Sequence, residues 1–336
     1  MFKPGVVEID ERIARLIRGD DCDYDELAVA LYRFQSARCD SYRVFCERHL
    51  EGRQVAGWRD VPAVPVGSFQ TQDYRTFPVS RTVATFQTSG TTSGVRGCHH
   101  FDSLELYRMA SMRSFGAAFL PDVERILVVS LIPYSDDSSL ARMVQWVLDE
   151  FGLPGSATDV TGALLSDSRQ PVLLLGTAVG LANLFESKPQ LRLPPGSRVM
   201  ETGGFKGRRK PLTRDEMFGF YQRAGIAPEY ALGEYGMTEL SSQWYEGVVG
   251  QVSPLLSERA YEPAPWARTR VIDPLTMVDV ADGEVGLLLH YDPVNRGSVA
   301  AILTADLGRR VGDGFQYRGR VPGAGLRGCS LRETEG

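Results

Sequence analysis

Residues 87–94 read Gln-Thr-Ser-Gly-Thr-Thr-Ser-Gly, a stretch made mostly of small and hydroxyl-bearing residues. The short run Val83-Ala84-Thr85-Phe86 before it predicts a strand, and a helix is expected several residues later, after Asp102 or Ser103. Hydroxyl groups and exposed backbone N–H groups in a flexible turn suit the oxygens of a polyphosphate. No Gly-Lys-Ser/Thr follows, so this is not the phosphate loop of P-loop kinases. Taken alone, the stretch is equally compatible with a Ser/Thr/Gly-rich surface linker.

A second stretch, residues 234–239, reads Glu-Tyr-Gly-Met-Thr-Glu and follows the run Tyr230-Ala231-Leu232, which predicts a strand. The hydroxyl of Thr238 and the carboxylate of Glu239 can hold Mg²⁺ and a phosphate oxygen, and Tyr235 offers a ring face to a base. By itself this stretch also reads as a turn before a helix. The two stretches together, each following a strand, indicate nucleotide binding far more specifically than either does alone.

Around these stretches, runs with strand character alternate with runs of helical periodicity. Continuous apolarity predicts buried strands at residues 126–132 and 172–175, and amphipathic spacing predicts a helix over 138–151. Thr213 and Glu216 form a capping box, which predicts the start of another helix. Such alternation predicts an α/β fold with an open, largely parallel sheet and helices on both faces. Ligands bind sheets of this kind where the strands end in loops.

The two ends of the chain differ from this central region. Ile9, Ile13 and Ile17 recur at helical spacing and predict an N-terminal helical segment. From about Trp266 onward, short strands and turns predict a smaller β-rich subdomain, with strands at 268–272, 285–291 and 299–303. We therefore expect four segments: helices at 1–60, an α/β core at 61–265, the β-rich subdomain at 266–320 and a tail at 321–336.

The composition argues against several classes of protein. The 336 residues are 43% hydrophobic and 24% charged, as in ordinary soluble globular proteins. A net charge of −5 argues against nucleic-acid binding, and the basic cluster at 206–210 has a plain interpretation as a solvated loop. No signal peptide or membrane span is recognisable, so we expect a cytoplasmic protein. Five cysteines without a CxxC pair and only four histidines predict neither a disulfide framework nor a His-rich metal site.

With these observations in place, a family resemblance becomes definite. The Thr-Ser-Gly-Thr-Thr-Ser-Gly and Tyr-Gly-Met-Thr-Glu stretches resemble two core motifs of the adenylate-forming superfamily of acyl-CoA synthetases, adenylation domains and luciferases. Residues 304–308 are similar to its later Thr-x-Asp motif, Gly319-Arg320 to its hinge-proximal Gly-Arg, and Gly203-Gly204 to the pair that lies against adenine. The resemblance implies a doubly wound αβαβα core, with ATP and Mg²⁺ as cofactors.

Finer features resemble one branch, the bacterial acyl-protein synthetases of the LuxE type. They are residues 64–69, 138–140 with Met143, 203–208 and 327–331. The resemblance covers most of the chain from about residue 60 and is weakest over the N-terminal helices. Larger relatives continue past the Gly-Arg hinge with a mobile domain that carries a catalytic lysine. Only Val321 to Gly336 follow the hinge in this sequence, so we expect that domain to be absent and its lysine to be dispensable or replaced.

The resemblance implies a role for each matching residue in ATP binding. The phosphates would contact the loop residues Thr88, Ser89, Gly90, Thr91, Thr92, Ser93 and Gly94, with Thr91 among the catalytic residues. Glu239 would hold Mg²⁺ with Thr238 beside it, and Asp306 would take the ribose with assistance from Arg320. Adenine would be framed by Gly203, Gly204 and Tyr235, and Gly236 is a further cofactor-binding candidate. Lys206, and with it Arg208, is our candidate for the charge of the missing lysine, unless both are simply solvated.

The acid and the acyl group involve further residues. His99 and His100 lie just after the phosphate stretch, in an expected loop, and are substrate candidates together with Ser138 and Met143. Cys329 is our candidate acyl acceptor, because Arg327 and Arg332 favour its thiolate and its position matches the acyl-accepting cysteine of the LuxE type. A tail cysteine without a role is the alternative.

Three functions stay open on this sequence. The first is an acyl-protein synthetase that adenylates a carboxylic acid and passes the acyl group to a thiol or a partner protein. The second is a stand-alone ligase that joins an aromatic or modified acid to an amine or a carrier protein. The third is a nucleotide-binding subunit without catalysis, against which the intact Thr91, Glu239 and Asp306 argue.

Overall fold

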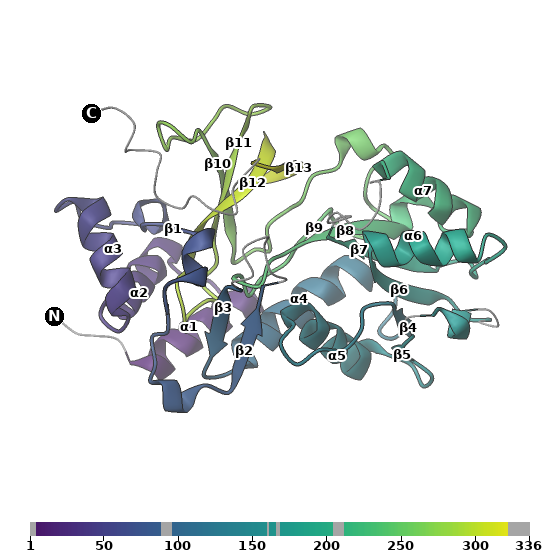
Figure 1. Ribbon diagram of the computed structural model, residues 1–336, viewed down its shortest axis with the longest axis horizontal. Coiled ribbons are helices and arrows are strands. Elements are labelled where there is room, and N and C mark those ends of the chain that lie inside the picture. Colours follow the sequence, from purple (N-terminus) through teal and green to yellow (C-terminus); the bar gives the residue numbers. More distant parts are fainter. Residues whose placement is uncertain (1–4, 89–95, 160, 166–168, 204–211, 322–336) are drawn as a thin grey trace. The chain divides into compact units, whose positions relative to one another are not determined.

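The computed structural model describes residues 5–88, 96–159, 161–165, 169–203 and 212–321 (Figure 1). The chain forms two compact units. Unit 1 comprises Met1–Ala110, Met237–Ser242 and Pro263–Gly336, and unit 2 comprises Ser111–Gly236 and Gln243–Glu262. The four segments expected from the sequence describe a different division of the chain, and they stay a prediction. No helix among the described residues is long and apolar enough to cross a membrane.

Unit 2 is built on a six-stranded sheet. Its order is β5 (Ala157–Thr158), β4 (Leu127–Ser130), β6 (Val172–Thr177), β7 (Arg198–Thr202), β8 (Ala231–Tyr235) and β9 (Trp244–Tyr245). All neighbouring pairs are parallel except β8 and β9. The central strands β4 and β6 are largely continuous apolar runs because helices bury both of their faces. Their carboxyl ends meet at one edge of the sheet, where Gly203 and Gly236 follow β7 and β8.

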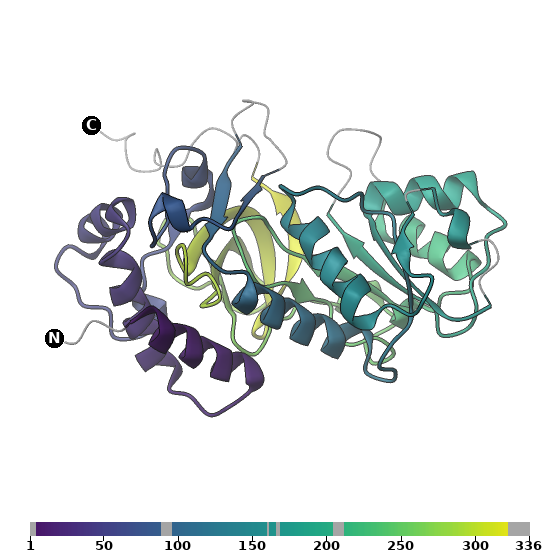
Figure 2. The same cartoon turned by 90° about the horizontal axis from the view of Figure 1, so that it is seen from below.

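Helices cover both faces of this sheet (Figures 1 and 2). They are α4 (Glu105–Phe119), which begins in unit 1, α5 (Ser139–Phe151), α6 (Ala178–Ser187) and α7 (Arg214–Arg223). Helices α6 and α7 pack with β6, β7 and β8 in one apolar cluster, which includes Leu174, Leu181 and Tyr221. The predicted capping box of Thr213 and Glu216 is present at the start of α7. The predicted doubly wound α/β fold is therefore confirmed.

Unit 1 combines helices with a mixed sheet in which all strand pairs but one are antiparallel. The helices are α1 (Val6–Arg18), α2 (Tyr24–Ser36) and α3 (Asp40–Leu50), and the fully buried Ile9, Ile13 and Ile17 form the inner face of α1. The sheet has the order β1 (Val64–Pro65), β12 (Ala301–Val311), β11 (Val285–Tyr291) and β10 (Arg268–Ile272), and β13 (Gly314–Arg320) pairs with β12. The helices are tied to this unit by the buried Gln35, whose amide nitrogen donates to the Asn295 carbonyl at 2.9 Å.

A β-hairpin of β2 (Ala84–Gln87) and β3 (Cys98–Phe101) completes the strands of unit 1. Short 3-10 helices lie at Trp58–Asp60, Val66–Gln70, Val79–Arg81, Ala163–Leu165, Pro228–Tyr230 and Leu256–Glu258. Two expectations differ from this arrangement. The third strand expected in the β-rich region runs from Ala301 to Val311 instead of 299–303, and β3 occupies a region expected to be a loop.

Candidate functional site

The predicted phosphate stretch is attached to the open end of the β2–β3 hairpin. Thr88 and Gly97 close this end, because the Thr88 N–H donates to the Gly97 carbonyl and the Gly97 N–H donates to Thr88 Oγ1, both at 2.9 Å. Arg96 adds a bond from its Nε to the Thr88 carbonyl at 2.6 Å. Ser89, Gly90, Thr91, Thr92, Ser93 and Gly94 lie outside the described residues. The strand predicted before the stretch is present, but a second strand follows it before the helix.

His99 and His100 therefore lie in β3, and their placement in a loop was wrong. The strand alternates between half-buried and buried side chains, so the two rings face opposite sides. His99 is 1% exposed, and burial lowers the pKa of its imidazole to about 4, which keeps the ring neutral. Its Nδ1 donates to the Thr238 carbonyl at 2.9 Å. His100 is less buried, burial lowers its pKa, and its Nδ1 lies 2.8 Å from Thr85 Oγ1.

Thr238 and Glu239 begin a short segment of unit 1, residues 238–242. Side chains from other parts of the unit form hydrogen bonds to the backbone of this segment. Glu239 is 6% exposed, and its backbone carbonyl accepts from Asn295 Nδ2 at 2.8 Å. The next backbone N–H groups are those of Ser241 and Ser242, which donate to Asp292 Oδ2 at 2.9 and 2.7 Å. The residues expected to hold Mg²⁺ thus belong to a segment whose backbone groups form hydrogen bonds with buried side chains.

Asp306 and Arg320 are brought together by the pairing of β12 with β13. The two residues are register partners, and Arg320 Nε donates to Asp306 Oδ1 at 2.8 Å. Asp306 is 2% exposed, whereas the side chain of Arg320 is 59% exposed. The backbone N–H of Asp306 donates to Thr304 Oγ1 at 3.0 Å, so the first residue of the Thr-x-Asp motif fixes the third. A carboxylate held in this way can accept hydrogen bonds from the hydroxyls of a sugar.

In unit 2 the expected adenine residues follow two adjacent strands. Thr202 and Glu234 are register partners in β7 and β8, so Gly203 and Tyr235 continue the two strands at the same edge. Gly203 has a φ of +65°, a conformation that favours glycine. Glu234 is buried beside them, and Thr202 Oγ1 donates to its carboxylate. Burial raises the pKa of Glu234 to about 7.

Gly236 has a steric reason to lack a side chain. A Cβ at this position would lie 2.6 Å from Oε1 of Glu234. The Glu234 carboxyl group therefore packs directly against the backbone at the end of β8. No feature of the sequence identified Glu234, although it is the first residue of the 234–239 stretch.

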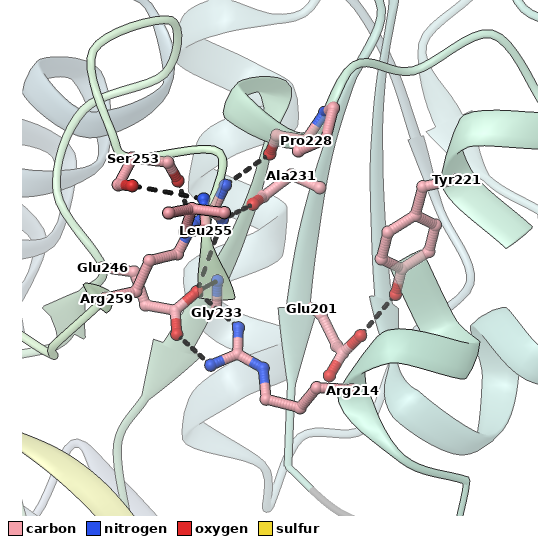
Figure 3. Close-up of polar contacts among 10 residues, drawn as sticks. All are labelled: Glu201, Arg214, Tyr221, Pro228, Ala231, Gly233, Glu246, Ser253, Leu255 and Arg259. Carbon is pink, nitrogen blue, oxygen red and sulfur yellow. Dashed lines mark hydrogen bonds and ion pairs between the residues drawn. The ribbon is translucent and has the colours of Figure 1, made fainter. Parts of the chain in front are cut away.

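A network of charged side chains next to β7 and β8 forms hydrogen bonds to β8 (Figure 3). Arg214 forms two bonds to Glu246, one of them from NH2 to Oε2 at 2.7 Å, and the Gly233 N–H donates to the same Oε2 at 2.8 Å. Arg259 donates to the Ala231 carbonyl at 2.7 Å. Tyr221 donates to Glu201, and burial raises the pKa of that carboxyl group. This network fixes the strand that ends in Tyr235.

Ser138 and Met143, the other expected substrate residues, both belong to α5 or its cap. Ser138 is the N-cap of the helix, and its Oγ accepts from the Ala141 N–H at 3.1 Å. Met143 is fully buried, with its sulfur 4.0 Å from the hydroxyl of Tyr245. The rings of Phe115 and Phe119 pack against Tyr245 from α4. In this structure both residues have structural partners within unit 2.

Several candidates have no described position. Gly204, Lys206, Arg208 and Cys329 lie outside the described residues, and so do the flanking Arg327 and Arg332. Among the residues that the structure does describe, no group of three or more His, Cys, Asp or Glu could hold a metal ion. Magnesium bound together with nucleotide phosphates needs only one or two carboxylates, so a single Glu239 next to a threonine hydroxyl fits that mode.

Asp292 and Asn295 contact the 238–242 segment, and no motif or periodicity identified either residue. Asp292 is fully buried and accepts from Ser242 Oγ at 2.8 Å and from the Val294 N–H at 3.1 Å, in addition to its two bonds described above. Burial raises its pKa to about 6, and these donors hold the rise in check. The turn signal Asp292-Pro293 is visible in the sequence, but it does not reveal which distant segment the turn contacts.

Comparison with known proteins agrees with the motif resemblance. No protein-family model matches the chain. The long-chain-fatty-acid–luciferin-component ligase of Vibrio harveyi is 23% identical over 338 residues, which cover 92% of this chain and 86% of that protein. The protein of the same name from Aliivibrio fischeri is 22% identical, with coverage of 84% and 78%. The predicted resemblance to LuxE-type acyl-protein synthetases is confirmed.

Solved structures support the fold. 2-Hydroxyisobutyryl-CoA ligase, in complex with 2-HIB-AMP and CoA, matches with a TM-score of 0.64 and 15% identity over 91% of this chain. This chain covers 65% of the length of that structure. ATP-bound MatB from Rhodopseudomonas palustris matches with a TM-score of 0.51 and 19% identity, over 71% of this chain and 48% of that one. At these identities the likeness establishes the adenylate-forming fold.

Proposed function

We propose that this chain is an ATP-dependent ligase that activates a carboxylic acid as an acyl-adenylate and then passes the acyl group to a thiol. The observation that carries the proposal is the 235–239 stretch. It begins at the carboxyl end of β8 and continues into residues 238–242, the hydrogen-bonded segment that contains Glu239. Two curated ligases named for long-chain fatty acids are similar over most of this chain. A fatty acid is accordingly the first substrate to test.

In the first step, a carboxylate oxygen of the acid attacks the α-phosphorus of ATP. A bond forms between that oxygen and phosphorus, the bond to the β-phosphate bridging oxygen breaks, and pyrophosphate leaves. The step depends on in-line positioning and on neutralisation of phosphate charge. We assign residues 88–94 to the phosphates, Thr91 among them, and Lys206 with Arg208 to charge stabilisation. Asp306, positioned by Arg320, would accept from the ribose hydroxyls.

Adenine is assigned to Gly203, Gly204, Tyr235 and Gly236, at the ends of β7 and β8. Glu239 would hold Mg²⁺ with Thr238 beside it, and the ion when bound would offset the charge of the phosphates. His100, Ser138 and Met143 are retained as residues near the acid, although Ser138 and Met143 have structural partners. His99, with its ring buried against the Thr238 carbonyl, is better suited to hold that segment than to contact substrate.

In the second step, the thiolate of Cys329 would attack the acyl carbonyl carbon, so that a thioester forms and AMP leaves. The proton of the thiol goes to solvent. A partner protein or an amine would then receive the acyl group from the thioester. A stand-alone ligase would instead transfer the acyl group directly from the adenylate, without a stable protein adduct.

The proposal is tested by ATP–pyrophosphate exchange with fatty, aromatic and amino acids in the presence of Mg²⁺. Wild-type protein should exchange with at least one class of acid. Glu239→Gln should reduce the rate by at least about 100-fold, because it removes the carboxylate proposed to hold the Mg²⁺ that would offset phosphate charge. Glu11→Gln is the matched control, since Glu11 is exposed on α1, and it should leave the rate unchanged. Wild-type protein that exchanges with no acid would refute the proposed activity.

A further inference from the structure

Three buried side chains from distant parts of unit 1 grip the backbone of residues 238–242. They are His99 from β3, and Asp292 and Asn295 from the connection between β11 and β12. Their fractional exposures to solvent are 1%, 0% and 1%, so each side chain is desolvated in the folded protein. A buried polar side chain is retained at a cost unless its hydrogen bonds offset the loss of solvation. Each of the three makes at least one of those bonds to the same five residues.

Asp292 accepts most of the hydrogen bonds at the end of the segment. Oδ2 accepts from the N–H groups of Ser241 and Ser242, and Oδ1 accepts from Ser242 Oγ and the Val294 N–H. Trp266 Nε1 also donates to Ser242 Oγ at 3.0 Å. The carboxylate therefore joins the segment to its own turn through four donors, which fixes the position of the segment relative to β11.

Asn295 and His99 hold the start of the segment. Asn295 Nδ2 donates to the carbonyl of Glu239 at 2.8 Å and to that of Val299 at 3.1 Å. His99 Nδ1 donates to the carbonyl of Thr238. Because a carbonyl can only accept, His99 must carry its proton on Nδ1. The two residues assigned to Mg²⁺ are therefore the two whose carbonyl groups are fixed by side-chain donors.

We propose that His99, Asp292 and Asn295 are positioning residues that set the backbone of residues 238–242 and so aim Glu239 at the nucleotide-bound metal ion. We call these three residues the 238–242 clamp. The inference rests on the proposed role of Glu239. Partners that orient a metal ligand commonly change metal affinity or activity by 10- to 100-fold when they are removed. The clamp acts on the backbone of the ligand instead of on its carboxylate.

The test uses full-length protein and two kinds of substitution. Asp292→Asn places an amide NH₂ against the N–H of Val294 or against those of Ser241 and Ser242, so part of the grip is lost. His99→Leu removes the donor to Thr238, whereas His99→Asn can keep a donor near the position of Nδ1. Asp279→Asn is the control, because Asp279 pairs with Arg59 and Arg270 and has no recorded bond to the segment.

Three measurements follow each variant. Hydrogen exchange of the peptide covering residues 238–242 reports how firmly the backbone of the segment is held. Calorimetry measures the affinity for ATP with and without Mg²⁺ and needs no turnover. The rate of pyrophosphate exchange is measured as a function of Mg²⁺ concentration. Asp292→Asn and His99→Leu should exchange amide hydrogens faster and need about 10- to 100-fold more Mg²⁺ for half-maximal rate. Their affinity for ATP in EDTA should stay at the wild-type value. His99→Asn should stay within about twofold of wild type, and Asp279→Asn should match it.

The outcomes separate this inference from the proposed function. Wild-type Mg²⁺ dependence in Asp292→Asn and His99→Leu, with faster amide exchange in the segment, would overturn the clamp while leaving Glu239 and the ligase activity intact. A wild-type enzyme that exchanges no pyrophosphate would overturn the proposed function and the clamp with it. If Asp292→Asn does not fold, the His99 pair decides: equal Mg²⁺ dependence of His99→Leu and His99→Asn would refute the inference.

Discussion

Glu234 should destabilise the folded protein at neutral pH, and replacing it with glutamine should relieve that cost. The carboxyl group is 6% exposed, and among the described residues its recorded donor is Thr202. Burial raises its pKa from 4.5 to about 7. The folded protein therefore holds the proton over a pH range in which the unfolded chain has lost it. Glutamine is neutral throughout and its amide oxygen can still accept from Thr202.

The sign and size of the effect follow from proton linkage. Between about pH 4.5 and pH 7 the folded state binds more protons than the unfolded state, so the free energy of unfolding falls as pH rises. Each pH unit of pKa difference corresponds to about 1.4 kcal/mol, so the cost of Glu234 reaches about 3 kcal/mol above pH 7. Glu234→Gln should thus be close to neutral at pH 4.5 and stabilising by about 3 kcal/mol at pH 8.

The assay is urea denaturation at pH 4.5, 6 and 8, followed by tryptophan fluorescence and by hydrogen exchange of peptides from β7 and β8. Hydrogen exchange is included because a chain with two compact units need not unfold in one step. Glu124→Gln is the control, since Glu124 is exposed in unit 2, and its effect should be small at every pH. A Glu234→Gln variant whose effect on the free energy of unfolding is the same at pH 4.5 and pH 8 would show that the pKa of Glu234 does not differ between the folded and unfolded states, and the reasoning would be refuted.

Two further predictions concern the charged network and the tail. Glu246→Gln should destabilise unit 2 by about 3 kcal/mol, because it leaves the charge of Arg214 and of the buried Arg259 without a full partner, and a melting temperature close to that of wild type would contradict this. Incubation with ATP and a competent acid should add one acyl group that hydroxylamine removes, as measured by intact mass. Cys329→Ala should lose that adduct while keeping pyrophosphate exchange, and an adduct that persists in the variant would exclude this thiol.

Much of the fold could be predicted because the signals are local. Strands β10 and β11 begin and end where the sequence predicts them, at Arg268–Ile272 and Val285–Tyr291. The capping box at Thr213 identified the start of α7 from two residues. Strand β3 was missed because its four residues include two histidines, which were counted as polar. Its period of two becomes visible only when His99 is recognised as a buried side chain, and that burial depends on the tertiary fold.

The site was predictable where it forms motifs and not where it depends on long-range contacts. The Thr-x-Asp and Gly-Arg residues could be named from the sequence, and β12 and β13 do pair Asp306 with Arg320. Asp292 contacts residues about fifty positions away, and neither segment carries a pattern that points to the other. Side chains that orient a functional segment from a distance leave no periodicity, so the clamp could be found only in the structure.

The two buried carboxylates that flank the 235–239 stretch should respond to neutralisation in opposite ways. Glu234 immediately precedes the stretch and has one recorded donor among the described residues, so burial dominates and its pKa rises to about 7. Asp292 accepts from four donors, three of them in residues 241 and 242, and burial raises its pKa from 3.8 to about 6, a shift of similar size. Neutral glutamine at 234 removes a desolvation cost and keeps its partner, whereas asparagine at 292 gives up bonds to donors that stay buried. The opposite responses therefore follow from the hydrogen bonds that neutralisation would break, some of the four at Asp292 and none at Glu234, and not from the size of the two pKa shifts.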